Sequence, residues 1–272
     1  MPVSEVQGKA IIVTGAGGGI GSAVCALLLK RGAKVIGVDI DSQSNRTVAE
    51  RLESTGQYEA VLGDTSSESS TEAFVDRCFA RFGAVDGVHL NAGVIGSYSS
   101  ITDMSVEDFD RESAINFRGA FLGIRAAARR MVGGGSIVVT ASTAGMSGNQ
   151  GLAAYTGTKH AAIGLVRAAA LDLAGDGIRV NAVCPGETDT PMLRRAVSGP
   201  GGDEMLSQFA SRIPLGRFAD PREIAEAVVW LLGDRSSYVT GSALVVDGGL
   251  TAGRFAPRRE TTDGLQTNRR RD

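Results

Sequence analysis

The chain of 272 residues has little of what several classes of protein need. Aromatic residues make up 5% of it and the formal net charge is −2, so it offers neither stacking platforms nor a basic surface for nucleic acid. No stretch approaches the ~20 apolar residues of a membrane span. The first nine residues lack the basic and apolar regions of a signal peptide. We therefore expect a cytoplasmic protein that binds neither nucleic acid nor membrane.

Residues that bind metals or form disulfides are also scarce. The three cysteines, Cys25, Cys78 and Cys184, lie far apart, and the two histidines, His89 and His160, lie in different segments. There is no CxxC pair, and an odd number of cysteines suits a reducing compartment. We expect three buried free thiols and no metal site.

Short apolar runs alternate along the chain with segments of helical periodicity. The runs predict strands at 10–13, 34–38, 58–62, 87–90, 136–140, 179–183 and 243–246. The periodic segments predict helices at 19–31, 47–52, 67–82, 105–130, 154–173 and 221–232. This alternation predicts an α/β fold with a parallel sheet flanked by helices on both faces.

Composition indicates how the chain is divided. No break interrupts residues 1–252, which we predict to form one domain. Residues 253–272 form a basic tail that we expect to be disordered. The Gly- and Pro-rich stretch 197–202 indicates a mobile loop within a substrate-binding segment at about 187–215.

A glycine-rich turn follows the first predicted strand and opens the first helix. It reads Thr-Gly-Ala-Gly-Gly-Gly-Ile-Gly over residues 14–21. Glycines let a ligand approach the backbone, and the helix start supplies free N–H groups for a pyrophosphate. Asp39 ends the second strand, 24 positions beyond Gly15, where its carboxylate can accept hydrogen bonds from ribose hydroxyls and repel a 2′-phosphate. Because Gly18 offers no balancing cation, the sequence predicts NAD rather than NADP, and Asp41 is interpreted as a helix-start residue.

Tyr155 and Lys159 stand four residues apart at the start of a predicted helix, hence on one face. A free phenol has a pKa of ~10, and a nearby ammonium favours the phenolate and lowers that value. The pair can then exchange a proton with an alcohol or ketone. Ser142 closes the fifth strand at the edge where open α/β sheets bind ligands, and its hydroxyl can hold the substrate oxygen.

With these motifs in order, the chain resembles the short-chain dehydrogenase/reductases over residues 8 to 252. The resemblance rests on residues 14–21, Asp64, Asn91-Ala92-Gly93, Asn116, Ser142, Tyr155 with Lys159, and Pro185-Gly186 followed by Thr190. It implies a single-domain Rossmann fold with a doubly wound, seven-stranded parallel sheet. It also implies association through the helices at about 105–130 and 154–173, often as a tetramer that uses residues 245–248, so we expect a homo-oligomer.

The resemblance also implies a role for each matching residue. Tyr155 is the general acid/base, Lys159 tunes it and binds the nicotinamide ribose, Ser142 orients the substrate oxygen, and Asn116 anchors a water of the proton relay. Asp64 would bind the adenine amino group, and Asn91 would support the central strand near the adenosine ribose. The full set of expected cofactor-binding residues is Gly15, Gly18, Gly19, Ile20, Gly21, Asp39, Ile40, Asp64, Thr65, Asn91, Ala92, Gly93, Tyr155, Lys159, Pro185, Gly186, Thr188 and Thr190.

Two positions depart from the family pattern. Leu90 stands where the family has a second asparagine, which puts strand-edge hydrogen bonds in doubt more than catalysis. Glu187 stands where many relatives carry an apolar or aromatic residue. It either shapes the substrate entrance or faces solvent, and the sequence favours neither.

The function predicted is NAD-dependent hydride transfer between the nicotinamide and a secondary alcohol or its ketone, such as a cyclic alcohol, a diol or a hydroxysteroid. The alternative enzyme is a 3-oxoacyl-[acyl-carrier-protein] or similar thioester reductase, against which Asp39 and Gly18 argue because such enzymes usually take NADPH. A third hypothesis is a dinucleotide-sensing regulator without turnover. It conflicts with the presence of all four catalytic residues, Asn116, Ser142, Tyr155 and Lys159.

Overall fold

The order of secondary-structure elements follows the predicted alternation. A computed structural model describes residues 5–52, 56–197 and 201–255. The strands are β1 (Ala10–Thr14), β2 (Lys34–Asp39), β3 (Tyr58–Leu62), β4 (Gly87–Leu90), β5 (Gly135–Thr140), β6 (Ile178–Pro185) and β7 (Ala243–Val246). The α-helices are α1 (Gly19–Lys30), α2 (Ser42–Leu52), α3 (Glu68–Phe82), α4 (Val106–Ser113), α5 (Gly119–Ala128), α6 (Ala153–Leu173), α7 (Pro191–Ala196), α8 (Gly202–Arg212) and α9 (Pro221–Leu232). The seven predicted strands are confirmed, with ends shifted by no more than two residues.

The strands form one parallel sheet in the order β3-β2-β1-β4-β5-β6-β7. From β1 the chain builds outward through β2 to β3, and then crosses back to add β4 on the other side of β1. In such a doubly wound sheet the crossovers on the two sides of β1 diverge, which opens a crevice at the carboxyl ends of β1 and β4. The predicted fold class is confirmed, and its topology locates the ligand site.

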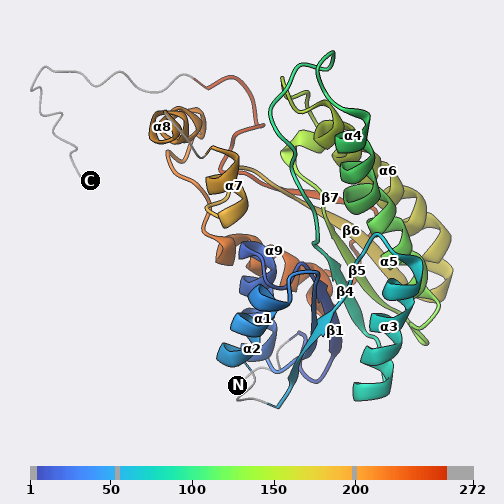
Figure 1. The fold of residues 1–272 in the computed structure, drawn as a ribbon. Helices are drawn as coiled ribbons and strands as arrows, with labels where there is room; N and C mark the ends of the chain where they lie inside the picture. The colour runs from blue at the N-terminus through green and yellow to red at the C-terminus, as the bar shows by residue number, and fades with distance from the viewer. Residues whose placement is uncertain (1–4, 53–55, 198–200, 256–272) are drawn as a thin grey trace, which may run out of the picture.

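Helices cover both faces of the sheet (Figure 1). Successive side chains of a strand point to opposite faces. In β1, Ile12 therefore packs into one hydrophobic cluster, whereas Ile11 and Val13 pack into the other. The first cluster takes residues from α3, α5 and α6, and the second takes residues from α1, α2 and α9. All three cysteines are buried in these two layers, as predicted.

The helix predicted over 105–130 is interrupted. Ser105 caps its start by accepting the backbone N–H of Asp108 at 3.1 Å, as its position predicts. After α4, however, residues Ala114–Arg118 form a π-helical turn before α5 continues. A π turn places an extra residue in the helix and often marks a functional site. Here it carries Asn116.

The segment predicted as a mobile substrate loop is largely helical. Residues 198–200 of the predicted 197–202 loop lie outside the described residues, but α7 and α8 flank them. Thr190 caps α7 by accepting the N–H of Leu193 at 3.3 Å, and Pro191 occupies the first turn. The helices α7 and α8 were not predicted, because Gly and Pro at 199–202 were given more weight than the helical capping signal at 190–191.

The second helix starts earlier than predicted, at Ser42 instead of Thr47. Asp41 accepts the backbone N–H of Gln43 at 2.9 Å and of Ser44 at 3.3 Å, which confirms its interpretation as a helix-start residue. From residue 256 on, the predicted disordered tail lies outside the described residues.

Candidate active site

The glycine-rich turn wraps closely against the loop that follows β4. Gly15 has φ +66°, a left-handed conformation that favours glycine, and a Cβ there would lie 3.0 Å from the Cα of Ala92. A Cβ on Gly21 would lie 2.0 Å from the carbonyl oxygen of Gly15. The turn ends at Gly18, whose backbone is extended and carries no side-chain cap, so the N-terminus of α1 faces the crevice. This is the geometry of an anion-binding helix start.

The carboxylate of Asp39 completes this cradle. Its Oδ2 accepts the N–H of Gly17 at 2.8 Å, and its Oδ1 accepts the N–H of Asp41 at 2.9 Å. The lining residues beside it are Ile40, Asp41 and Ser44, none of which is positively charged. Among the described lining residues beside Asp39, no cation offsets its negative charge at this end of the crevice, where the sequence predicts the adenosine.

The far side of this end of the crevice is formed after β3. The Asp64 carboxylate accepts the backbone N–H of Ser66 at 2.8 Å and the Ser66 hydroxyl at 2.7 Å. The backbone N–H of Asp64 donates to the Ser70 hydroxyl at 2.9 Å. Thr65 follows Asp64 and lines the same cavity. Both residues line the cavity, and their contact with the adenine stays a prediction.

Asn91 joins three strands beneath the crevice. Its backbone N–H donates to Thr14 Oγ1 at 2.9 Å, and its Nδ2 donates to the carbonyl of Thr14 at 3.1 Å. Its Oδ1 accepts the hydroxyl of Thr140 at 3.2 Å, and that hydroxyl also lies 2.8 Å from His89 Nε2. Because the Thr140 hydroxyl donates its proton to Asn91, His89 Nε2 is the donor in the hydrogen bond between His89 and Thr140 Oγ1. Thr14 opens the glycine-rich motif but was given no role from the sequence, and His89 and Thr140 were not among the predicted site residues. Leu90, the departure from the family, is buried beside Gly123.

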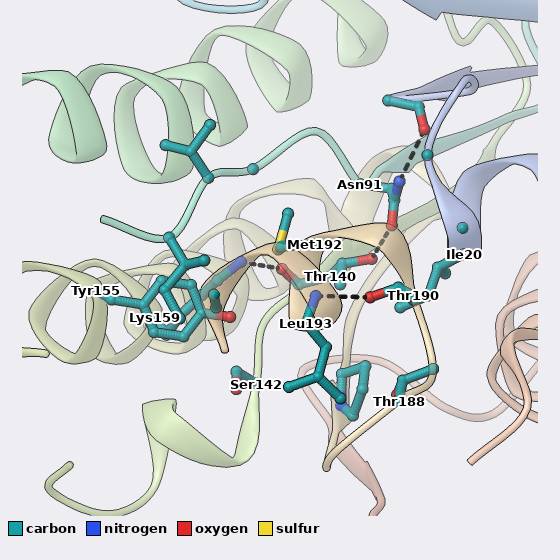
Figure 2. Close-up of a pocket in the computed structure, with 18 of the residues that line it drawn as sticks. Ile20, Asn91, Thr140, Ser142, Tyr155, Lys159, Thr188, Thr190, Met192 and Leu193 are labelled. Atoms are coloured by element: carbon teal, nitrogen blue, oxygen red, sulfur yellow. Dashed lines mark hydrogen bonds between the residues drawn. The ribbon is translucent and has the colours of Figure 1, made fainter. Parts of the chain in front are cut away.

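Tyr155 and Lys159 lie in the first turns of α6 and face Ser142 across the crevice (Figure 2). Lys159 Nζ donates to the carbonyl of Thr140 at 2.8 Å and lies 5.5 Å from the centre of the Tyr155 ring. Ser142 Oγ accepts the N–H of Ala144 at 3.1 Å, which fixes it at the end of β5. The predicted constellation is thus brought together around one cavity.

Burial sets the proton affinities of this pair. It raises the pKa of Tyr155 to about 12, against which the hydrogen bond with Ser142 acts. It lowers the pKa of Lys159 to about 8. The expectation of a lowered phenol pKa is not met in the protein alone, because desolvation of the phenolate by burial is the largest effect on Tyr155.

Asn116 holds the loop that follows β4 by two hydrogen bonds to its backbone. Its Oδ1 accepts the N–H of Val94 and its Nδ2 donates to the carbonyl of Val94, each at 2.8 Å. The Nδ2 also donates to Thr158 Oγ1 at 3.2 Å, next to the catalytic turn of α6. A Cβ on Gly93 would lie 3.1 Å from Asn116 Oδ1, so glycine is needed for this approach. The water implied by the family resemblance remains a proposal.

The segment after β6 returns over the glycine turn. Gly186 packs against Asp247, where a Cβ would lie 2.8 Å from the aspartate Cβ. The Thr188 hydroxyl donates to the Gly186 carbonyl at 3.1 Å. A Cβ on Gly19 would lie 2.7 Å from the methyl group of Thr190, so the two ends of the cradle meet there. Pro185 to Thr190 therefore close one end of the crevice, where the family resemblance implies that the nicotinamide would bind.

All of these walls enclose one cavity of about 920 Å³. It is lined by every predicted site residue except Gly21 and Asn116, which lie behind the turn and the loop that they hold. In the described part of the chain there is no group of three or more His, Cys, Asp or Glu side chains that could hold a metal ion. Nor do the described helices include one long and apolar enough to cross a membrane.

Comparison with known proteins defines the family. A family model described as enoyl-(acyl carrier protein) reductase matches residues 15–251. The chain is 41% identical over 254 residues to a 2,5-dichloro-2,5-cyclohexadiene-1,4-diol dehydrogenase of Sphingobium indicum, covering 92% of this chain and 100% of that protein. It is 34% identical to a cyclohexanol dehydrogenase of an Acinetobacter species, covering 92% and 97%. The crystal structure of levodione reductase matches with a TM-score of 0.89 and 32% identity, covering 91% and 99%. The chain belongs to the short-chain dehydrogenase/reductase family, as the resemblance indicated.

Proposed function

We propose that this protein is an NAD-dependent dehydrogenase of cyclic secondary alcohols, with Tyr155 as general acid/base. The observation that carries the proposal is one continuous cavity that joins the glycine cradle and Asp39 at one end to Ser142, Tyr155 and Lys159 at the other. The names of the relatives support the substrate class, since they include a cyclohexadienediol dehydrogenase, a cyclohexanol dehydrogenase and a cis-4-hydroxycyclohexanecarboxylate dehydrogenase.

The residues present fit a nicotinamide dinucleotide. At Gly15 and Gly19 a Cβ would collide with neighbouring atoms, so only bare backbone fits there. The start of α1 has no side-chain cap, which suits a pyrophosphate. Asp39, held by two backbone N–H groups, is placed to accept ribose hydroxyls and to repel a 2′-phosphate. Thr188 and Thr190 would contact the nicotinamide end. When bound, NAD⁺ would supply the hydride acceptor and a positive charge beside the phenol.

Within this cavity the chain's own residues handle the proton. Ser142 Oγ and the Tyr155 hydroxyl would hold the substrate oxygen between them. At neutral pH the buried phenol keeps its proton, since its pKa is raised to about 12, so Tyr155 is ready to donate to a ketone oxygen. For alcohol oxidation it must accept the proton, which needs positive charge nearby. Lys159, fixed by the Thr140 carbonyl, supplies one such charge.

The alternative, an acyl thioester reductase, is favoured by one observation, the description of the matching family model. The uncompensated carboxylate of Asp39 argues against the NADPH that such enzymes usually take. No observation favours the sensor hypothesis. The presence of Ser142, Tyr155 and Lys159 around the cavity argues against it.

A cofactor and substrate screen tests the proposal. The purified protein is assayed with NAD⁺ and NADP⁺ on cyclohexanol, cyclohexanediols and hydroxysteroids, and in reverse on ketones and 3-oxoacyl thioesters. We expect turnover of cyclic alcohols with at least about tenfold preference for NAD⁺, the size of effect of one charged contact of about 1.4 kcal/mol. Preference for NADPH with thioesters would replace this proposal by its alternative.

A further inference from the structure

One acidic side chain in the cavity has no part in the chemistry described above. Glu187 follows Pro185-Gly186 at the end of β6 and lines the cavity that also holds Tyr155 and Ser142. Its side chain is half-buried. This answers the question that the sequence left open: Glu187 faces the substrate cavity and is not simply a solvent-facing residue.

The backbone holds Glu187 firmly in this place. Its carbonyl accepts the N–H of Ala219 at 3.0 Å, and the N–H of Asp189 donates to the Ala219 carbonyl at 2.9 Å. Thr188 and Ala219 thus form a parallel bridge outside the main sheet. A side chain on such a fixed segment can impose a preferred orientation on a ligand.

The carboxylate itself lacks a partner. Among the described residues, no donor forms a hydrogen bond with it and no cation lies within 4.0 Å, although the charge of Arg212 acts on it from farther away. Burial raises its pKa, and its negative charge in turn raises the pKa of Tyr98 and of Tyr155. The charge of Glu187 therefore acts on Tyr98 and Tyr155, which both line the cavity. A desolvated carboxylate without a donor gains most from a ligand that brings one.

The rest of the substrate end mixes apolar residues, among them Ile95, Leu152, Met192, Leu193 and Phe209, with uncharged polar residues such as Asn149 and Gln150. The apolar side chains suit the carbon skeleton of a ring. Ser142 and Tyr155 take the reacting oxygen, and Glu187 is the acidic side chain whose charge acts on Tyr155, so it is suited to accept a hydrogen bond from a second polar group. A cationic group is disfavoured, because Arg212 already places a positive charge near the carboxylate.

We infer that Glu187 accepts a hydrogen bond from a second, non-reacting hydroxyl of the substrate, so that the preferred substrates are ring diols and their hydroxyketones. This rests on the proposed function and narrows its substrate class. A relative of this chain is named for a cyclohexadiene-1,4-diol, which is a neutral ring with two hydroxyls.

The test compares cyclohexanol with the cis and trans isomers of cyclohexane-1,2-diol and cyclohexane-1,4-diol, with NAD⁺, in the wild type, Glu187→Leu and Glu187→Gln. For the wild type we expect the best diol to exceed cyclohexanol in kcat/KM by about 10- to 100-fold, the range for a hydrogen bond to a charged group. Glu187→Leu should bring this ratio close to one. Glu187→Gln, which keeps a neutral acceptor, should retain part of it, mainly through a lower KM for the diol than Glu187→Leu shows.

A matched control removes one negative charge elsewhere. Asp172 is exposed near the end of α6, about 25 Å along the helix from Tyr155, so Asp172→Asn should leave the diol ratio unchanged. Thermal unfolding of every variant checks that the fold is kept.

Three results would overturn the inference. The first is a wild type that oxidises cyclohexanol as well as any diol while turning over both, which leaves the proposed function intact. The second is a diol preference that survives in Glu187→Leu. The third is faster turnover of trans-4-aminocyclohexanol than of the diols, since the carboxylate would then select a cation. Absence of turnover with every alcohol would instead remove the proposed function and this inference together.

Discussion

Tyr155 illustrates how the surroundings of one side chain change its chemistry. From the sequence, its spacing from Lys159 predicts a phenol whose pKa an ammonium lowers. In the structure, burial raises that pKa to about 12, and Lys159 Nζ is fixed on the Thr140 carbonyl. The identity of the pair was predictable from its spacing and context. The balance between desolvation and charge was not, because it depends on which atoms of distant strands surround the ring.

Glu112 is a second residue that sequence patterns did not single out. It lies on α4, one turn before Asn116, and is 2% exposed. One carboxylate oxygen accepts the N–H of Gly96, whereas Oε2 has no hydrogen-bond partner among the described residues. Together with the hydrogen bond between Asn116 and Val94, this contact holds the loop after β4 against the helix. Its spacing of four residues from Asn116, which puts both side chains on one face of a helix, is the sequence signal that could have identified Glu112.

Glu112→Gln should stabilise the protein in a pH-dependent way. Burial raises the pKa of Glu112 in the folded state above its unfolded value, so folding disfavours the ionised form. Below the unfolded pKa both states are protonated and this cost is absent. It develops as pH rises through the folded pKa. We expect the variant to gain about 1 kcal/mol, or roughly 2–4 °C in Tm, at neutral pH and nothing in acid.

Thermal unfolding across the pH range measures this difference, with the exposed Asp110→Asn on the same helix as control. A gain that is equal at acidic and neutral pH would show that the buried charge is not its cause.

At the scale of elements, the strands were predictable because parallel strands buried on both faces are continuous apolar runs. In the structure, Ser105 caps α4, and Asp220 caps α9 in a capping box that Pro221 follows. The π turn carries no such local signal. It is stabilised by tertiary contacts, notably those of Asn116 with Val94 and Thr158, which join segments that are 22 and 42 positions away.

The glycine turn gives a prediction at this scale. Gly15→Ala must place a side chain at φ +66° and 3.0 Å from Ala92, in the wall of the cofactor crevice. We expect the affinity for NADH to fall by at least about tenfold and the protein to lose about 1–3 kcal/mol of stability. Calorimetric titration with NADH and thermal unfolding measure the two effects.

Gly83→Ala is the matched control for this variant. Gly83 ends α3 at φ +80°, and a Cβ there meets nothing within 4 Å. It should lose stability alone and bind NADH like the wild type. Equal affinities for Gly15→Ala and Gly83→Ala would contradict the placement of the pyrophosphate at this turn.

At the scale of the whole molecule, the outer surface of α4 and α5 carries apolar side chains. Phe117 and Phe121 are four residues apart, hence on one face, and are 39% and 44% exposed. Val106 and Phe109 are exposed on the preceding turns. Contiguous exposed apolar side chains mark interaction surfaces. They agree with the association through this helix that the family resemblance implies, which we keep as a proposal.

Charge substitutions on this surface test the proposal. We expect the wild type to be a dimer or tetramer, and Phe117→Arg and Phe121→Arg, made separately, each to shift it toward the monomer. Size-exclusion chromatography with light scattering measures the mass. Val132→Arg, at a residue that is 93% exposed in the turn before β5, should leave it unchanged. A monomeric wild type would refute this use of the surface.

The account as a whole depends on a proton and a hydride leaving the same carbinol beside Tyr155. Its most direct measurement follows deuterium from cyclohexanol labelled at the carbinol carbon, by mass spectrometry of the cofactor, in the wild type and in Tyr155→Phe. We expect one deuterium in the reduced nicotinamide per turnover in the wild type. In Tyr155→Phe we expect transfer slowed by about 10²- to 10⁴-fold, with NADH binding retained. Deuterium released to water, or transfer at the wild-type rate without the phenol hydroxyl, would contradict the account.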